Sequence, residues 1–164
     1  MAEDFETIVN TYSKQVLNTA IRILGDREKA LDVHQEVFLA IWQRWHSFNG
    51  QTNWSGYLYR TTVRKAIELA KKHRKETSID NELEQFSNEK PHQRLEAVEL
   101  QQMVMKALSK LPDKQADVFV LAKIEGLKAE QIAQILQCSP NTVRVHLHRA
   151  IKTLAEKLGN YLKK

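Results

Sequence analysis

The most specific cluster of chemically active side chains lies near the C-terminus, on a predicted helix that begins at Ser139 and Pro140. Serine caps the first amides of a helix, and proline fits its first position. Arginine on this helix can bind guanine O6 and N7 or phosphate, and the free amides of the first turn can also bind phosphate. The candidate DNA-contacting residues are Thr142, Arg144, Val145, His148 and Arg149. The pattern therefore predicts a helix that contacts DNA.

The residues before this helix supply a second helix and a short turn. Small Ala133 allows the two helices to cross closely, and the crossing is filled by Ile132, Leu136, Val143 and Leu147. The turn spans residues 137–139, with Gln137 where many such turns carry glycine. A helix-turn-helix places its second helix in the major groove, and this is the predicted arrangement. The alternative is an ordinary helical hairpin with a solvated basic face.

The elements that must position these side chains are all helical. We expect helices at residues 5–24, 27–48, 55–74, 95–111, 113–124, 129–136 and 140–158, from the spacing of apolar side chains. No stretch alternates as a strand does, and five glycines and three prolines leave too few turns for a β-sandwich or barrel. The predicted fold class is all-α.

Enzymatic chemistry has little support in the sequence. The single cysteine, Cys138, excludes a disulfide framework and a multi-cysteine zinc site, and its place in the turn favours a buried core thiol. Histidines and carboxylates lack metal-ligand spacing, and no glycine-rich phosphate loop is present. We expect no catalytic residue, metal or cofactor. The acidic start is unlike a secretory signal and no apolar run approaches about 18 residues, so we expect a cytoplasmic protein without a membrane contact.

The formal net charge of +5 is unevenly distributed. Residues 54–75 carry +6 and residues 138–164 carry +5, whereas residues 76–100 between them carry −5. Two basic segments favour two contacts with a polyanion, because lysine and arginine displace counterions from phosphates; the alternative is that both faces are merely solvated. The acidic stretch has little apolar periodicity, which predicts a disordered or extended linker. We therefore expect domains at 1–75 and 93–164, joined by a linker at 76–92.

Motifs along nearly the whole chain resemble those of the extracytoplasmic-function (ECF) sigma factors, the small two-domain promoter-recognition subunits of bacterial RNA polymerase in the sigma-70 family. The segments that carry the resemblance are Phe5-Glu6, Tyr12, Leu24-Gly25-Asp26, residues 32–38 with Trp42, Phe48-Asn49-Gly50, Leu58-Tyr59-Arg60, residues 107–112, Gly126, residues 130–133 and residues 139–150. The resemblance implies an N-terminal helical bundle (sigma region 2) and a C-terminal helix-turn-helix domain (sigma region 4). It also implies a subunit that directs core polymerase to promoters and is not an enzyme.

The resemblance further implies three binding surfaces. Core polymerase is expected to bind through the β′ coiled coil at Asp32, Gln35, Glu36 and Phe38, with the β flap as a further contact. The −10 promoter element is expected at Asn49, Asn53, Trp54, Arg60, Arg64 and Lys65, and the −35 element at Thr142, Arg144, Val145, His148 and Arg149. Trp54 fits a core anchor equally well, and core packing is the favoured interpretation of Trp42 and Trp45.

Two departures from the family pattern bear on binding and regulation. Arg64 and Glu68 stand where relatives commonly carry Asn and Asp, and Lys29-Ala30-Leu31-Asp32 keeps one acid of the usual three. Phosphorylation of Thr61 or Thr62 by a Ser/Thr kinase would restore negative charge and could replace control by an anti-sigma factor. The alternative is that both threonines pack or hydrogen-bond within their helix.

A second functional class also fits the helix-turn-helix. A stand-alone dimeric regulator would bind its operator without polymerase, whereas a sigma factor binds weakly alone and tightly as part of the holoenzyme. The first domain favours the sigma interpretation, because it has tryptophans on the docking helix and no ligand-pocket motif.

Overall fold

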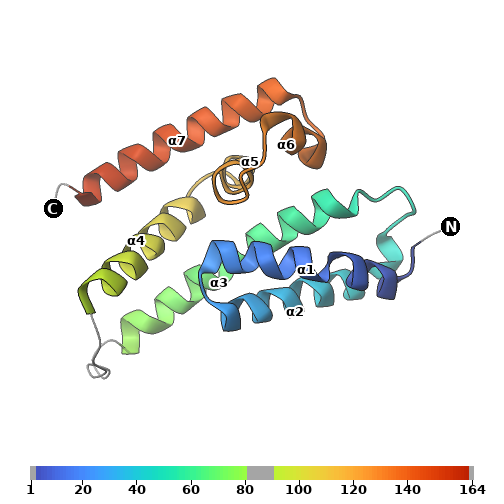
Figure 1. The fold of residues 1–164 in the computed structure, drawn as a ribbon, viewed down its shortest axis with the longest axis horizontal. Helices are drawn as coiled ribbons and strands as arrows, with labels where there is room; N and C mark the ends of the chain where they lie inside the picture. Colours follow the sequence, from blue (N-terminus) through green and yellow to red (C-terminus); the bar gives the residue numbers. More distant parts are fainter. Residues whose placement is uncertain (1–2, 81–90, 163–164) are drawn as a thin grey trace.

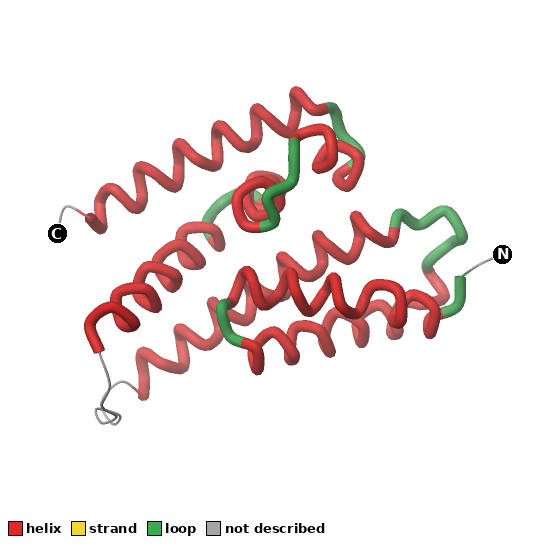
Figure 2. The backbone as a smooth tube through the Cα atoms, viewed as in Figure 1, coloured by secondary structure: helices red, strands yellow, loops and turns green. Residues whose placement is uncertain are grey.

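The computed structural model describes residues 3–80 and 91–162, with side chains described for residues 3–72 and 99–159. The elements are α1 (Phe5–Leu24), α2 (Arg27–Gln43), a 3-10 turn (Trp45–Ser47), α3 (Trp54–Asp80), α4 (Pro91–Ser109), α5 (Asp113–Phe119), a π-helical turn (Val120–Ile124), α6 (Ala129–Leu136) and α7 (Pro140–Leu162). No strand occurs in the described residues, so the all-α prediction is confirmed. Figure 2 shows loops between successive helices within residues 3–80 and within residues 91–162.

Local sequence signals set the helix ends in the N-terminal half. The Asp4 carboxylate accepts a hydrogen bond from Thr7 N at 2.7 Å and begins α1, and Asp26 accepts from the first amides of α2. Gly25 adopts a left-handed φ of 66° and ends α1, a conformation that glycine reaches without Cβ strain.

Several predicted boundaries differ from the observed ones. The second helix ends at Gln43 and is followed by the 3-10 turn, and the helix expected at 113–124 changes to π geometry at Val120. The predicted linker at 76–92 is partly helical, since residues 76–80 continue α3 and residues 91–92 begin α4. A helix that is already nucleated can extend without an apolar face. The loss of apolar periodicity therefore did not predict where α3 ends and α4 begins. The rest of the predicted linker, 81–90, lies outside the described residues.

The two halves of the chain, α1–α3 and α4–α7, lie side by side (Figure 1). One apolar core includes Ile8, Val37 and Leu58 of the first half together with Leu108 and Leu154 of the second. A smaller core fills the α6–α7 crossing. The α3 helix contacts α4, α5 and α6, and α1 contacts the π-helical turn. The structure therefore packs the two halves directly against each other.

Candidate functional site

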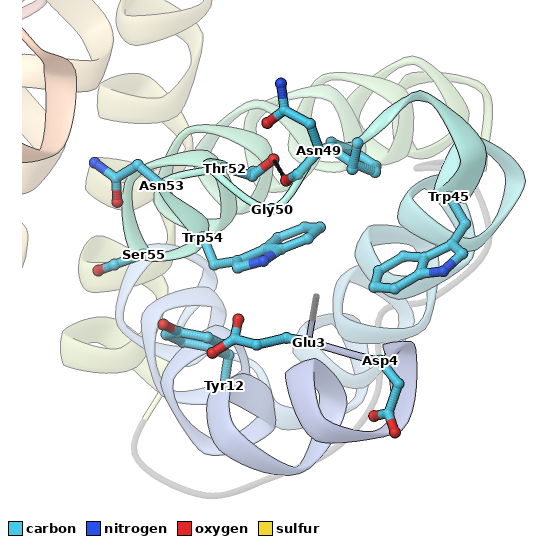
Figure 3. Close-up of a pocket in the computed structure, with 11 residues that line it drawn as sticks. Glu3, Asp4, Tyr12, Trp45, Asn49, Gly50, Thr52, Asn53, Trp54 and Ser55 are labelled. Atoms are coloured by element: carbon cyan, nitrogen blue, oxygen red, sulfur yellow. Dashed lines mark hydrogen bonds between the residues drawn. The ribbon is translucent and has the colours of Figure 1, made fainter. Parts of the chain in front are cut away.

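A pocket of about 660 Å³ lies at the end of the N-terminal bundle, beneath the loop that precedes α3. Its walls include Tyr12, Trp45, Phe48 and Trp54 as well as the polar loop at 49–53. Figure 3 shows the Trp54 indole facing this space, with Tyr12 of α1 across from it. The loop is braced internally, because the Thr52 hydroxyl donates to the Asn49 carbonyl at 2.9 Å (Figure 3). Flat aromatic walls beside amide groups suit a planar, polar-edged ligand such as a base.

Trp54 is primarily a core residue. It is 8% exposed, stacks on Trp45 with ring centroids 5.7 Å apart, and also contacts Phe48 and Tyr57. Trp54 therefore packs as a core anchor. The part of its ring that lines the pocket stays a candidate for contact with a base. Asn53 caps the same helix, since its Oδ1 accepts from Gly56 N at 3.1 Å.

The basic residues predicted on α3 lie on different faces of the helix. Lys65 lies beside α2 and pairs with Glu36 at 3.6 Å. Arg64 instead points toward the C-terminal half, where its Nη2 lies 3.4 Å from Asp117 Oδ2 and 3.8 Å from Asp113 Oδ2. Of these two predicted DNA-binding residues, Lys65 therefore contacts α2 and Arg64 contacts α5.

Asp117 on α5 is an unusual carboxylate for its surroundings. Its side chain is 2% exposed, and its Oδ1 has no hydrogen-bond partner among the described residues. Burial raises the pKa of Asp117 to about 6, although the nearby Arg64 and Arg60 oppose the shift and Asp113 adds to it. The pKa of this carboxyl group therefore lies well above its ordinary value and below neutral pH.

The two threonines predicted as phosphorylation sites both hydrogen-bond within α3. The Thr62 hydroxyl donates to the Leu58 carbonyl at 2.7 Å and the residue is 1% exposed, so the prediction for Thr62 is wrong for the folded protein, because a kinase cannot reach a core hydroxyl. Thr61 is half-buried and donates to the Tyr57 carbonyl at 2.8 Å.

The outer face of α2 forms a shallow apolar groove with α1. The groove has a volume of about 490 Å³ and is lined by Phe5, Val9, His34, Gln35, Phe38, Leu39 and Trp42. Asp32, Gln35 and Glu36 are exposed on α2 as the docking prediction requires, whereas Phe38 is only 7% exposed and packs edge-on against His34. Phe38 is therefore a core residue at the floor of the groove rather than a free contact.

Trp42 lies on the surface of α2 and not in the core. It was expected in the core, but it is 58% exposed and touches Phe5 with ring centroids 4.9 Å apart. Leu31 and Leu39 are also exposed, and the apolar positions 31, 39 and 42 lie on one helix face, at multiples of the i, i+4 and i, i+3 spacing. That second apolar row was the available signal, because Val33, Val37 and Ile41 already supply the buried face.

The C-terminal half contains the predicted helix-turn-helix. Ser139 Oγ accepts from Thr142 N at 3.0 Å at the start of α7, and Gln137 adopts a left-handed φ of 54° in the turn. The predicted contact residues lie outward, with Arg144, Val145, His148 and Arg149 exposed and Thr142 partly exposed. Arg144 pairs with Glu130 of α6 at 2.8 Å. The exposed face of α7 therefore carries the cations Arg144 and Arg149 beside the apolar Val145.

Among the side chains that the structure describes, at residues 3–72 and 99–159, no group of three or more His, Cys, Asp or Glu residues is arranged to hold a metal ion. No helix within residues 3–80 and 91–162 has the length and hydropathy needed to cross a membrane.

Comparison with known proteins gives the same two-part division. Residues 8–76 match the family described as Sigma-70 region 2, and residues 101–154 match Sigma-70, region 4. The ECF RNA polymerase sigma factor SigW of Bacillus subtilis is 28% identical over 94% of this chain and 88% of its own length. The ECF RNA polymerase sigma-E factor of Escherichia coli is also 28% identical, over 94% of this chain and 86% of its own length.

Two solved structures share the fold. The sigma factor RpoE of Bartonella quintana, in complex with the anti-sigma factor NepR, aligns with a TM-score of 0.53 at 23% identity over 95% of this chain and 97% of its own. CnrH, in complex with the cytosolic domain of CnrY, aligns with a TM-score of 0.51 at 24% identity over 95% of this chain and 88% of its own.

Proposed function

Since this chain belongs to the sigma-70 family as an ECF sigma factor, we propose that three separate surfaces carry out its work in promoter-directed initiation. The groove and acidic residues of α2 bind the β′ coiled coil of core polymerase. The pocket and α3 bind the −10 element, and α7 contacts the −35 element while its domain meets the β flap.

The observation that carries the docking assignment is the exposed apolar row on α2 beside Asp32 and Glu36. An apolar patch with a charged rim is typical of a surface that another protein covers. The carboxylates steer a basic partner helix toward the groove, and burial of Trp42 and Leu39 then holds it.

The −10 assignment is supported by the aromatic pocket and the cations near it. A base that leaves the stack can enter between the aromatic walls while Lys65 and Arg60 contact the backbone, which is the usual combination for single strands. Asn49 and Asn53 place amide groups at the rim of this pocket, where they can bind base edges.

The −35 assignment is supported by the exposed face of α7. Arg144 and Arg149 can donate two hydrogen bonds each to guanine, and Val145 can contact a thymine methyl group. The capped first turn adds a phosphate contact that fixes the helix in the groove.

The experiment that tests this function uses the full chain with and without bacterial core polymerase. DNA fragments retained by the holoenzyme are sequenced, and a selected fragment is then transcribed. We expect weak DNA binding by the chain alone and specific transcripts with core polymerase. Tight operator binding by a dimer without polymerase would instead establish the stand-alone regulator.

Regulation is the remaining part of the proposal. The anti-sigma factor bound in the Bartonella quintana structure supports control of this chain by a similar partner. Phosphorylation by a Ser/Thr kinase is proposed at Thr61 alone, since Thr62 is buried. Transcription that is unchanged by Thr61→Ala under inducing conditions would eliminate the kinase, and Thr61→Ser, which keeps a hydroxyl, is the matched control.

A further inference from the structure

The pocket beneath the 49–53 loop is lined by an unequal set of charged side chains. Among the described residues, its walls include two carboxylates, Glu3 and Asp4, and no lysine, arginine or histidine. The other polar side chains of the lining are hydroxyls and amides, which both donate and accept hydrogen bonds, whereas an ionised carboxylate only accepts them. The pocket therefore offers a ligand more acceptors than donors.

Of the two carboxylates, Glu3 is the one directed into the pocket. Figure 3 shows its side chain reaching toward Tyr12, across the pocket from Trp54, whereas the Asp4 side chain points away from that space. Asp4 is already engaged as the cap of α1, because it accepts a hydrogen bond from Thr7 N at 2.7 Å. Glu3 has no hydrogen bond or ion pair with any residue that the structure describes. Its carboxylate is therefore available to a ligand in the pocket.

The aromatic walls leave the edge of a base to the polar lining. Tyr12 and Trp54 face the pocket from two sides, and Trp54 is fixed by stacking on Trp45 at 5.7 Å. A base that leaves its stack is held through its flat faces by such rings. The groups that distinguish one base from another lie at its edge, and that edge meets the polar side chains of the lining, Glu3 among them. Glu3 is therefore placed to take part in base selection.

The four bases differ in what they offer to a carboxylate. Cytosine, adenine and guanine each carry an exocyclic amino group, which donates hydrogen bonds, whereas thymine carries carbonyl oxygens and a methyl group instead. A carboxylate that faces a carbonyl oxygen brings two acceptors together with no proton between them, so both lose their hydrogen bonds with water. A carboxylate at the position of Glu3 therefore favours a base with an amino group and disfavours thymine.

The cations that we assign to the DNA backbone lie outside this pocket. Arg60 and Lys65 are not among its lining residues, so they attract phosphate without contacting the base inside it. Contacts to phosphate position a strand, whereas contacts to base edges select sequence. The Glu3 carboxylate also repels phosphate, which keeps the sugar-phosphate backbone out of the pocket while a base edge enters. Affinity and base selection are therefore supplied by different residues.

We propose that Glu3 is a specificity-determining residue of the −10 surface, where its carboxylate accepts a hydrogen bond from the amino group of an unstacked base and thereby selects against thymine. This inference rests on the proposed function of the pocket. A good polar contact to a base edge is enough for about tenfold discrimination against the wrong base. The role is not visible in the local sequence, because Glu3 precedes α1 and the pocket is assembled from α1 and the distant loop before α3.

The test uses holoenzyme reconstituted from core polymerase and the full chain. Fluorescent single strands carry the −10 element of a promoter that the holoenzyme selects, and each position in turn is changed to the other three bases. Glu3→Gln keeps the length of the side chain, removes the charge and adds an amide donor that can pair with a thymine carbonyl. Asp4→Asn is the matched control, because it removes the same charge one residue away and asparagine still caps a helix. Fluorescence anisotropy at one fixed salt concentration measures each affinity.

At the position that enters the pocket, we expect the wild type and Asp4→Asn to bind thymine about tenfold more weakly than the best base with an amino group. In Glu3→Gln this difference should fall to about twofold or less. A preference that is unchanged in Glu3→Gln would overturn the inference, and so would a wild type for which no position disfavours thymine. An equal loss of preference in Asp4→Asn would overturn it as well, because the effect would then come from net charge.

One further variant separates this inference from the proposed function. Tyr12→Ala removes an aromatic wall and leaves Glu3 in place, so it should lower single-strand affinity about fivefold if the pocket holds a base. Thermal denaturation checks that the variant is folded, and an abasic site at the selected position gives the same readout without changing the protein. If neither change lowers the affinity, the pocket binds no base and the inference about Glu3 falls with the −10 assignment. If both lower it while Glu3→Gln keeps the base preference, the −10 assignment stands and the role of Glu3 alone is overturned.

Discussion

At the scale of single residues, Gln137 carries a backbone cost in the helix-turn-helix turn. Its φ of 54° and ψ of 49° are left-handed, a conformation in which a Cβ crowds the following carbonyl. Gln137→Gly is expected to raise the free energy of unfolding by about 1 kcal/mol, as measured by urea denaturation. Gly126, with φ 70° and nothing near its Cβ position, is the matched control. Gly126→Ala should lower stability, and a loss of stability in Gln137→Gly would contradict the argument.

Asp117 makes stability depend on pH. Because burial raises its pKa to about 6, above the ordinary value of about 3.9, the folded protein binds more protons than the unfolded chain between about pH 4 and pH 6. This carboxyl therefore lowers stability as pH rises through that range, and the deficit persists at neutral pH. Three charged groups act on the same carboxyl: Arg64 and Arg60 oppose the rise in its pKa, and Asp113 adds to it.

The variant Asp117→Asn removes the titration while keeping the side-chain shape. We expect its free energy of unfolding at pH 7.5 to exceed that of the wild type by about 1–3 kcal/mol. This gap in stability between the two proteins should narrow as pH falls from 6 toward 4. Thermal denaturation at both ends of this range measures the gap. A gap of equal size at pH 4 and pH 7.5 would show that the carboxylate is not the cause.

At the scale of elements, α2 shows how much a helical pattern can predict. The pattern predicted its start at Arg27, directly after the residue that caps it, Asp26, and the inward positions Val33, Val37 and Ile41 that the core covers. It did not predict which apolar residues stay exposed, because a helix with two apolar rows has a wide apolar face. How much of that face is covered depends on the neighbouring helices. For this reason Trp42, expected in the core, is exposed, and Phe38, expected at the polymerase contact, is buried.

The exposed row on α2 leads to a prediction about polymerase binding. Trp42→Ala is expected to weaken binding to core polymerase by about 30-fold, since exposed tryptophans that become buried in an interface are common hot spots. It should leave thermal stability nearly unchanged. Trp45→Ala is the matched control, because Trp45 stacks on Trp54 within the bundle and its loss lowers stability. Equal polymerase affinity of Trp42→Ala and wild type, by pull-down titration, would remove the groove from the docking surface.

At the scale of the whole molecule, the sequence predicted two helical parts but not their contact. Charge partition and motifs were informative within each part, because caps, turns and apolar periods are local. The Arg22–Glu125 pair joins residues 103 positions apart, and the periodicity of a single helix cannot predict a pair between distant segments. Arg64 illustrates the limit: its departure from the family pattern was visible, but its partner Asp117 became evident only when the two halves were placed together.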